Sequence, residues 1–242
     1  MIPVDRAPLP PELDDLLHRR TLRLGPAPTP SEARASWSSA DAVKSQLRSQ
    51  LVRVTARPAF CMYCQESWGT DIDHYRPVVL APHLAFVWTN HLLACGYCNQ
   101  QAKREAFPTT AGGDPLLLDP TVDDSGLHLA MSHAGHLIPL TRRGEATVQV
   151  LRLNARSEIT VAREQALLHI ERHLRRTRDL GITLTHGEVQ GFRHLSILDT
   201  LHFFTHAVAR GDLARTRSSR DLAGYATDQL PLLRRLFPQC TL

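Results

Sequence analysis

The sequence predicts an α+β protein, in which a small cysteine-bearing core is followed by a mostly helical C-terminal region. Four paired cysteines and several strand-like segments come before residue 156, and apolar residues recur at helical spacing from Ser157 onward. A chain of 242 residues suits one domain, or a small core with an appended second unit. We therefore divide it into an N-terminal extension (1–58), a core with adjoining strand segments (59–155) and a helical region (156–242).

The N-terminal extension is expected to contain a helix and a linker. Residues 1–38 are rich in proline, with a short helix starting near Asp14 and a linker over 26–30. Residues 41–55 place apolar side chains on one helical face, and Pro58 ends that helix.

The end of the second segment is expected to contain short strands. The strand-like pieces are residues 116–118, 127–131 and 136–140, and the Ala134-Gly135 step between the last two predicts a hairpin turn. Residues 144–153 fit a helix or a strand, and we favour a helix.

The helical region is expected to hold three helices. The first covers 157–180 and ends at Gly181, and the second starts with a capping box and runs over 185–210. The third begins near Ser218 and is interrupted at Pro231. Broad apolar faces alternate with arginines there, which predicts docking of a partner or homo-oligomerisation.

Composition excludes a membrane-spanning class and favours a cytoplasmic protein. No apolar run approaches the roughly 20 residues of a membrane span, and the N-terminus lacks the pattern of a signal peptide. The formal net charge of +4 does not by itself demand nucleic acid. Lys44 and Lys103 are the only lysines, so arginine dominates; a coding bias explains this better than phosphate binding.

Four of the five cysteines form two C-x-x-C pairs, which predicts a metal site. With no export signal, disulfides are not expected, and two such pairs form a tetrahedral thiolate site for structural Zn²⁺. An iron site of the rubredoxin kind or a redox pair is the alternative. Cys240 is expected to be a free thiol. The four paired residues are Cys61, Cys64, Cys95 and Cys98.

Residues between and after the pairs suit hydrolysis. Asp73 directly precedes His74; a carboxylate can bind a hard cation, and an imidazole can take a proton from water near neutral pH. Asn90 leads into the second cysteine pair, Asn99 follows it, and Lys103 comes four residues later.

This order of residues closely resembles the zinc-bearing HNH endonucleases, which have a ββα-metal (His-Me finger) site. The resemblance implies a zinc-stapled core in which a β-hairpin and a helix present the catalytic residues. It implies that His74 is the general base and that Asn90 braces the loop carrying it. Asp73 and Asn99 would ligate catalytic Mg²⁺ or Mn²⁺. Lys103 matches the basic residue that follows the motif, and His91 stands where an apolar residue is usual, so we assign it to packing.

Three basic residues are candidates for nucleic-acid binding: Arg76, Lys103 and Arg104. Arg76 could equally meet a neighbouring carboxylate. Arg104, Arg142 and Arg143 could form a DNA patch, although a solvated face is the better interpretation.

Further stretches resemble the HNH nuclease components of Septu-type and retron-associated bacterial defence systems. They include Phe60 and the segments 75–77, 107–108 and 115–120. This resemblance implies a DNA-cleaving effector of antiphage defence that works with a co-encoded ATPase or another defence subunit. The alternatives are a non-catalytic zinc module that binds nucleic acid or protein, and an RNA-cleaving HNH enzyme.

Two histidine pairs in the helical region have metal-ligand spacing without a carboxylate motif nearby in the sequence. His202 and His206 stand one helical turn apart, as do His169 and His173. We assign both pairs to helix packing.

Overall fold

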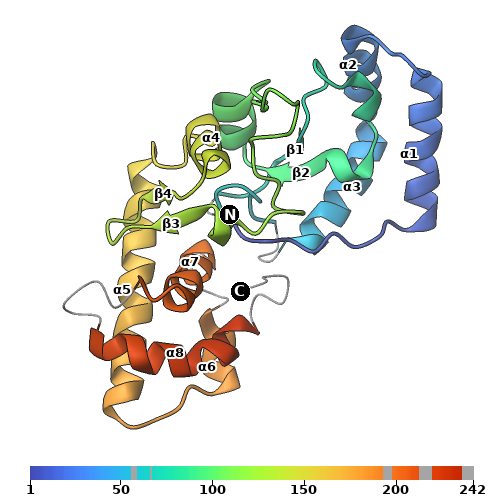
Figure 1. Ribbon diagram of the computed structural model, residues 1–242. Helices are drawn as coiled ribbons and strands as arrows, with labels where there is room; N and C mark the ends of the chain where they lie inside the picture. Colours follow the sequence, from blue (N-terminus) through green and yellow to red (C-terminus); the bar gives the residue numbers. More distant parts are fainter. Residues whose placement is uncertain (56–58, 66, 193–197, 213–219, 236–242) are drawn as a thin grey trace. The chain divides into compact units, whose positions relative to one another are not determined.

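The computed structural model describes residues 1–55, 59–65, 67–192, 198–212 and 220–235 (Figure 1). The chain divides into two compact units. The N-terminal unit is Val4–Thr121, and the C-terminal unit is Met1–Pro3 together with Val122–Leu242. Each combines helices with one small antiparallel strand pair, which agrees with the expected mixture of helix and strand. Among the described residues, none of the helices has the length and apolar character that crossing a membrane requires.

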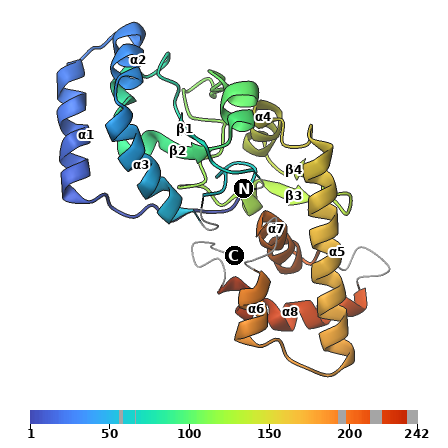
Figure 2. The ribbon, with the colours of Figure 1, turned by 180° about the vertical axis from the view of Figure 1, so that it is seen from behind.

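Three helices group beside the strand pair of the N-terminal unit: α1 (Pro11–Leu24), α2 (Pro30–Ser38) and α3 (Asp41–Val54) (Figures 1 and 2). The helix expected over 41–55 is confirmed, and its apolar stripe is buried as the spacing predicts. The helices share one apolar core, to which Leu13, Leu17, Val43, Leu47 and Phe86 contribute.

Helix α2 lies directly after the segment that the sequence suggested as a linker. It begins because Thr29 accepts a hydrogen bond from the backbone N–H of Glu32, and Glu32 accepts one from the backbone N–H of Thr29. Pro30 occupies the first helical position, where its missing N–H costs nothing. The T-x-x-E spacing was the sequence signal for this helix.

The strand pair of this unit consists of β1 (Asp71–His74) and β2 (His91–Ala94), with Asp71 opposite Ala94 and His74 opposite His91. Two 3₁₀ turns, η1 (Pro82–Leu84) and η2 (Trp88–Asn90), lie between the strands, and a π-helical segment, η3 (Tyr97–Lys103), follows them. Because side chains alternate along a strand, Asp71 and Asp73 both contact η3, whereas the His74 ring lies against Trp37 of α2.

The C-terminal unit begins with a 3₁₀ turn, η4 (Ser125–Leu127), and a hairpin of β3 (Leu129–Met131) and β4 (Leu137–Pro139), followed by α4 (Arg142–Leu151). The hairpin and the preference for a helix after it are confirmed. Gly135 supplies the positive φ, 73°, that the turn requires.

The strand expected over 116–118 is wrong. These leucines are buried in an irregular segment, and the backbone carbonyl of Leu117 accepts a hydrogen bond from the Tyr75 hydroxyl at 2.6 Å. An apolar run of this length indicates burial, which does not require a sheet.

Four further helices lie in the described part of the C-terminal unit: α5 (Ser157–Asp179), α6 (His186–Gly191), α7 (Leu198–Ala209) and α8 (Arg220–Arg234). The helix over 157–180 and the capping box at Thr185 are confirmed. The described part of the helix expected over 185–210 consists of α6, which ends at Gly191, and α7, which starts at Leu198. Helix α8 continues past Pro231, which the sequence expected to interrupt it; its expected start at Ser218 and residues 193–197 lie outside the described residues.

The boundary between the units falls after Thr121, whereas the sequence division placed one at 155/156. The hairpin and α4 group with the C-terminal helices because β3 packs against α7 and β4 against α4. The apolar side chains of these helices pack into one shared core within this unit, which includes Ile170, Leu174, Leu201 and Phe204.

Candidate functional site

Four buried cysteines meet in the N-terminal unit and could hold a zinc ion. Their sulfur atoms all lie within 4.8 Å of one another, and the Cys64 and Cys95 Sγ atoms are 3.9 Å apart. A tetrahedral Zn²⁺ site with Zn–S bonds of about 2.3 Å has S···S edges of about 3.8 Å. The spacing therefore fits zinc. The other members of the cluster are Cys61 and Cys98.

A backbone hydrogen bond holds the first cysteine pair against β2, and the second pair directly follows that strand. The N–H of Met62, inside the first pair, donates to the carbonyl of Leu93 on β2 at 2.8 Å. The second pair starts where β2 ends, and the Cys98 N–H donates to Cys95 Sγ at 3.4 Å. A metal bound here would tie the strand pair to η3.

Asp73 is buried between β1 and η3, and both of its carboxylate oxygens have partners. Tyr63 Oη donates to Oδ2 at 2.6 Å, and Lys103 Nζ donates to Oδ1 at 2.9 Å. The Lys103 ammonium also donates to the His74 carbonyl at 2.8 Å. The side chains of Asp73 and Lys103 are 3% and 0% exposed, so they form an ion pair shielded from water.

His74, the last residue of β1, is held in one tautomer. Its Nε2 lies 3.0 Å from the Ala85 carbonyl oxygen. A carbonyl can only accept, so Nε2 carries the proton and the neutral ring has its lone pair on Nδ1. Burial lowers the pKa of His74 below its ordinary value of 6.5, more than the Ala85 contact and Asp73 raise it. The ring is therefore neutral near pH 7 with Nδ1 able to accept a proton.

An aromatic cluster surrounds the His74 ring. Trp37 of α2 meets it edge-on at 4.5 Å between ring centroids and stacks on His91 at 5.0 Å. His91 Nε2 also lies 3.0 Å from the Ala85 carbonyl oxygen. Complete burial, and then the neighbouring His74, lower the pKa of His91 well below 6.5. His91 thus packs as a neutral ring, which agrees with its assignment to packing.

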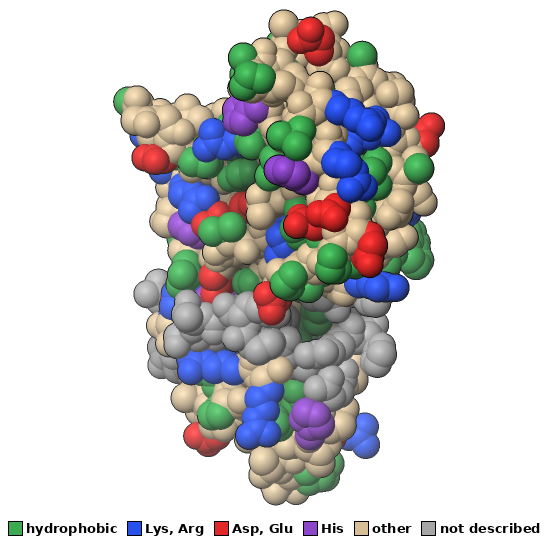
Figure 3. Space-filling model, turned by 90° about the vertical axis from the view of Figure 1, so that its right-hand side faces the viewer, with side chains coloured by type: hydrophobic (Ala, Val, Ile, Leu, Met, Phe, Trp, Pro, Cys, Tyr) green, Lys and Arg blue, Asp and Glu red, His purple; other side chains and the backbone are tan. Residues whose placement is uncertain are grey.

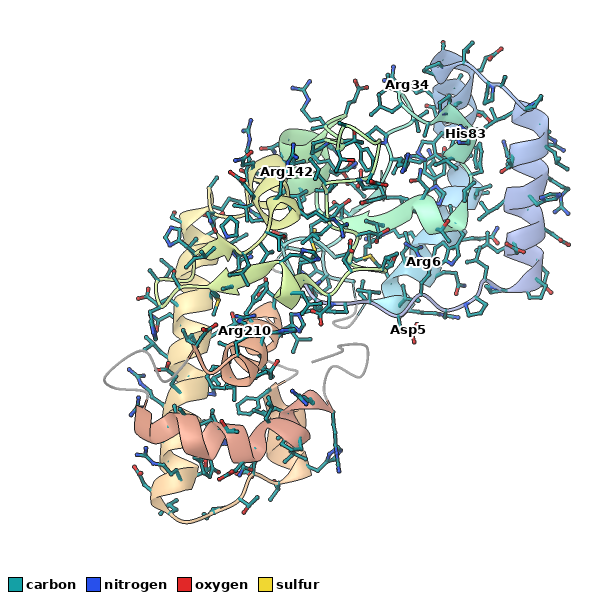
Figure 4. The ribbon with its side chains drawn as sticks, in the orientation of Figure 1. Asp5, Arg6, Arg34, His83, Arg142 and Arg210 are labelled. Carbon is teal, nitrogen blue, oxygen red and sulfur yellow. The ribbon has the colours of Figure 1, made fainter. Side chains whose placement is uncertain are left out.

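Asn90 fixes the loop that follows His74. Its Oδ1 accepts from the Arg76 N–H at 2.8 Å, and its Nδ2 donates to the carbonyls of Arg76 and Leu84 at 3.1 and 3.3 Å. Arg6, which precedes α1, holds the backbone on either side of Asn90. It donates to the carbonyls of Trp88 and His91 at 2.9 Å each (Figure 4). Arg6 was not expected here, because nothing near it in the sequence marks this long-range contact.

Asp73, His74 and Asn99 line one cavity of about 240 Å³. Asn99 Nδ2 donates to Asp71 Oδ2 at 3.0 Å, and its amide oxygen makes no hydrogen bond among the described residues. A carboxylate and an amide oxygen are the hard donors that Mg²⁺ prefers. The Asp73 oxygens keep lone pairs for a cation because a carboxylate offers about four acceptor positions. The donor set thus fits the divalent ion that the resemblance implies.

Two arginines lie at the rim of this cavity. Arg104 follows η3 and is exposed, and Arg34 extends from α2 and pairs with Glu105 (Figure 4). Arg34 and Trp37 were missed at the sequence level because α2 was not expected. The guanidinium group of Arg76 lies over the Phe107 ring, 5.2 Å from its centroid.

The other basic residues are less well placed than Arg34 and Arg104 to bind nucleic acid at this cavity. Lys103 was expected to contact it, but its ammonium is buried against Asp73 and cannot reach a ligand at the surface in this arrangement. Arg143 makes two hydrogen bonds of 2.6 Å to Asp123, and Arg142 is exposed in the same unit (Figure 4). On the face drawn in Figure 3, basic side chains of the described residues are interspersed with acidic ones and form no continuous patch. Cys240 lies outside the described residues.

Comparison with known proteins does not assign a family to this chain. Neither a family model nor a curated protein matches the chain.

Proposed function

We propose that this chain is a metal-dependent endonuclease of the HNH type that hydrolyses phosphodiester bonds in DNA. The observation that supports it best is the state of His74: a neutral ring with Nε2 tied to Ala85 and Nδ1 able to accept a proton, beside two oxygen donors in one cavity. A zinc module that only binds a partner has no use for such a base.

In the proposed mechanism the chain's own residues position and deprotonate a water molecule. His74 Nδ1 takes the proton of the attacking water, while the Ala85 carbonyl keeps the ring in orientation. Asp73 and Asn99 would hold Mg²⁺ or Mn²⁺, which supplies neutralisation of the charge that develops on the phosphate. Arg34 and Arg104 at the rim suit contacts to phosphate oxygens. The four-thiolate zinc would be structural, because four ligands leave it no open position.

The setting is also proposed from the resemblance alone: a bacterial antiphage defence system with a co-encoded ATPase or another defence subunit as partner. The C-terminal helices are the proposed docking or oligomerisation region.

Cleavage of labelled duplex DNA by the full chain, with Mg²⁺ or Mn²⁺ and with excess EDTA, tests the proposal. His74→Ala is expected to lower the rate by about 10²–10⁴-fold, the usual cost of losing a general base. His83→Ala is the matched control, because His83 is an exposed histidine of the same unit that does not line the cavity (Figure 4). Near wild-type cleavage by His74→Ala, or cleavage insensitive to EDTA, would contradict it.

The same cleavage assay is repeated with an RNA substrate of the same sequence. Faster cleavage of RNA would assign the activity to the RNA-cleaving alternative. DNA binding without cleavage, equal in wild type and His74→Ala, would instead indicate the non-catalytic zinc module.

A further inference from the structure

A second cluster of metal-binding side chains lies inside the C-terminal unit. Asp124 stands at the start of η4, and His202 and His206 lie one turn apart on α7. Their ligand atoms all lie within 4.8 Å of one another. The side chains are 7%, 0% and 2% exposed. The fold thus supplies the carboxylate that the sequence did not place beside this histidine pair.

The two histidine rings converge on one carboxylate oxygen. The Nε2 atoms of His202 and His206 lie 3.1 and 3.2 Å from Asp124 Oδ1. The same oxygen already accepts a hydrogen bond from the Gly126 N–H at 3.0 Å. Three nitrogen atoms therefore crowd one oxygen.

Hydrogen bonding leaves part of this cluster unsatisfied. Among the described residues, the buried atoms His206 Nε2 and Asp124 Oδ2 have no hydrogen-bond partner, although His206 Nε2 is close to Oδ1. Buried polar atoms without partners are rare and costly, and in proteins a bound water or ion commonly satisfies them. An ion seated between the rings and the carboxylate would satisfy these atoms.

The distances match a tetrahedral ion. Zn²⁺ binds imidazole nitrogen and carboxylate oxygen at about 2.0–2.1 Å, so the edges of its coordination tetrahedron measure about 3.3 Å. The two N···O separations, 3.1 and 3.2 Å, are close to that edge. Two imidazoles and one carboxylate also form a donor set typical of zinc.

Gly126 and Arg210 hold η4 and α7 close together. A Cβ atom at Gly126 would lie 2.1 Å from the His206 ring, so a side chain there would displace the histidine. Arg210, just beyond α7, donates to the Gly126 carbonyl at 2.9 Å (Figure 4). The missing side chain at Gly126 and the Arg210 hydrogen bond therefore let η4 and α7 come close enough for Asp124 to meet His206.

We propose that Asp124, His202 and His206 bind a second divalent transition-metal ion, with Zn²⁺ the best fit, which fastens η4 to α7. The burial of all three ligands makes this site structural. It is independent of the cysteine cluster and of the proposed nuclease activity, because none of its ligands lies in the N-terminal unit.

Metal content of the purified full chain tests this proposal. After growth with zinc and removal of loosely bound metal, elemental analysis is expected to find about two zinc ions per chain, one in each cluster. His206→Gln and Asp124→Asn are expected to lower this to about one, because each removes or weakens a ligand while keeping the side chain's size. His169→Gln is the control, since His169 is an exposed histidine on α5 and is expected to leave the zinc content unchanged.

Substitution with Co²⁺ gives a second readout. The wild-type spectrum should contain thiolate-to-cobalt charge-transfer bands from the cysteine cluster together with d–d bands from a nitrogen–oxygen site. His206→Gln should lose only the second set. One metal ion per wild-type chain, or an unchanged content in a folded His206→Gln chain, would overturn the proposal and leave a hydrogen-bonded Asp–His cluster. The wild-type count decides the question even where the variants fail to fold.

Discussion

Lys103 and Asp73 form a buried ion pair at the centre of the candidate site, and this pair changes what substitutions there should do. The resemblance implied a metal ligand in Asp73 and a basic residue near the nucleic acid in Lys103. In the structure the two lie 2.9 Å apart with almost no exposure. Removing one partner of such a pair leaves a buried charge without compensation. This lowers the free energy of unfolding far more than the loss of a solvent-exposed ion pair does.

We therefore expect Lys103→Ala to destabilise the N-terminal unit by about 3–5 kcal/mol. Asn99→Ala should leave stability nearly unchanged, because Asn99 is only half-buried and its partner Asp71 also accepts a hydrogen bond from Gln100. Urea unfolding followed by tryptophan fluorescence measures both. All three tryptophans, Trp37, Trp68 and Trp88, lie in this unit. Equal midpoints for Lys103→Ala and wild type would show that the pair is not formed in solution.

His91 should make the N-terminal unit sensitive to acid. Its pKa in the folded state is well below 6.5 because the ring is buried, while the unfolded chain takes up a proton near 6.5. Below that pH the unfolded state holds more protons, so the free energy of unfolding falls as the pH drops and levels off below the lowered pKa. The neighbouring His74 contributes in the same direction.

His91→Phe should weaken this pH dependence without loss of the fold. A phenyl ring can still stack on Trp37, and the Ala85 carbonyl keeps its contact with His74. The substitution also removes the buried Nδ1 atom of His91, which has no hydrogen-bond partner in the described part of the chain. Urea midpoints between pH 5.5 and 7.5 should change less for His91→Phe than for wild type. Parallel curves for the two proteins would contradict a buried neutral histidine.

At the scale of elements, α5 shows how a charged residue can belong to an apolar face. The sequence spacing put Ile159, Leu167, Ile170 and Leu174 on the buried face, and all four are buried. Arg163 lies on the same helix and carries a charge, yet it is fully buried and donates to Asp199 at 3.2 Å. Helical periodicity identifies the buried face of α5. Whether an arginine can lie on that face depends on a charged partner, here Asp199, which is 36 residues away in the sequence.

Helix α2 matters to the site because it supplies Arg34 and Trp37, and its start depends on the Thr29 cap. Thr29→Ala should lower the stability of the N-terminal unit by about 1 kcal/mol, the usual cost of a lost cap, and should weaken the packing of Trp37 on the histidines. Thr29→Ser, which keeps the hydroxyl, is the matched control. The measurement is the urea midpoint from tryptophan fluorescence. An unchanged midpoint for Thr29→Ala would show that α2 does not rely on its cap.

At the scale of the whole molecule, local signals predicted much of the fold, and long-range contacts account for what they missed. The spacing of the cysteines predicted their meeting in one cluster, because each pair forms a local turn. Helical periodicity located α3 and α5. The Asp124–His202–His206 cluster and the Arg6 contacts could not be predicted, because they join residues 78 to 85 positions apart and depend on tertiary packing.

The two compact units also predict how the molecule responds to loss of the cysteine cluster. Zinc contributes folding free energy outright to small structural sites, and the four clustered cysteines lie in the N-terminal unit, whose strand pair is anchored through them. The C-terminal unit has an apolar core of its own, built from α5, α7 and α8. Cys64→Ser should therefore unfold the first unit and leave the second folded.

Limited proteolysis with mass spectrometry distinguishes the two units. In Cys64→Ser, cleavage sites within residues 4–121 should become accessible, while α5, α7 and α8 should stay protected and most of the helical circular dichroism signal of the C-terminal unit should remain. Cys240→Ser is the control, because Cys240 belongs to neither C-x-x-C pair and its loss is expected to change neither the digestion pattern nor the zinc content. If Cys64→Ser exposes both units at once, the chain folds as one cooperative body and the second core does not stand alone.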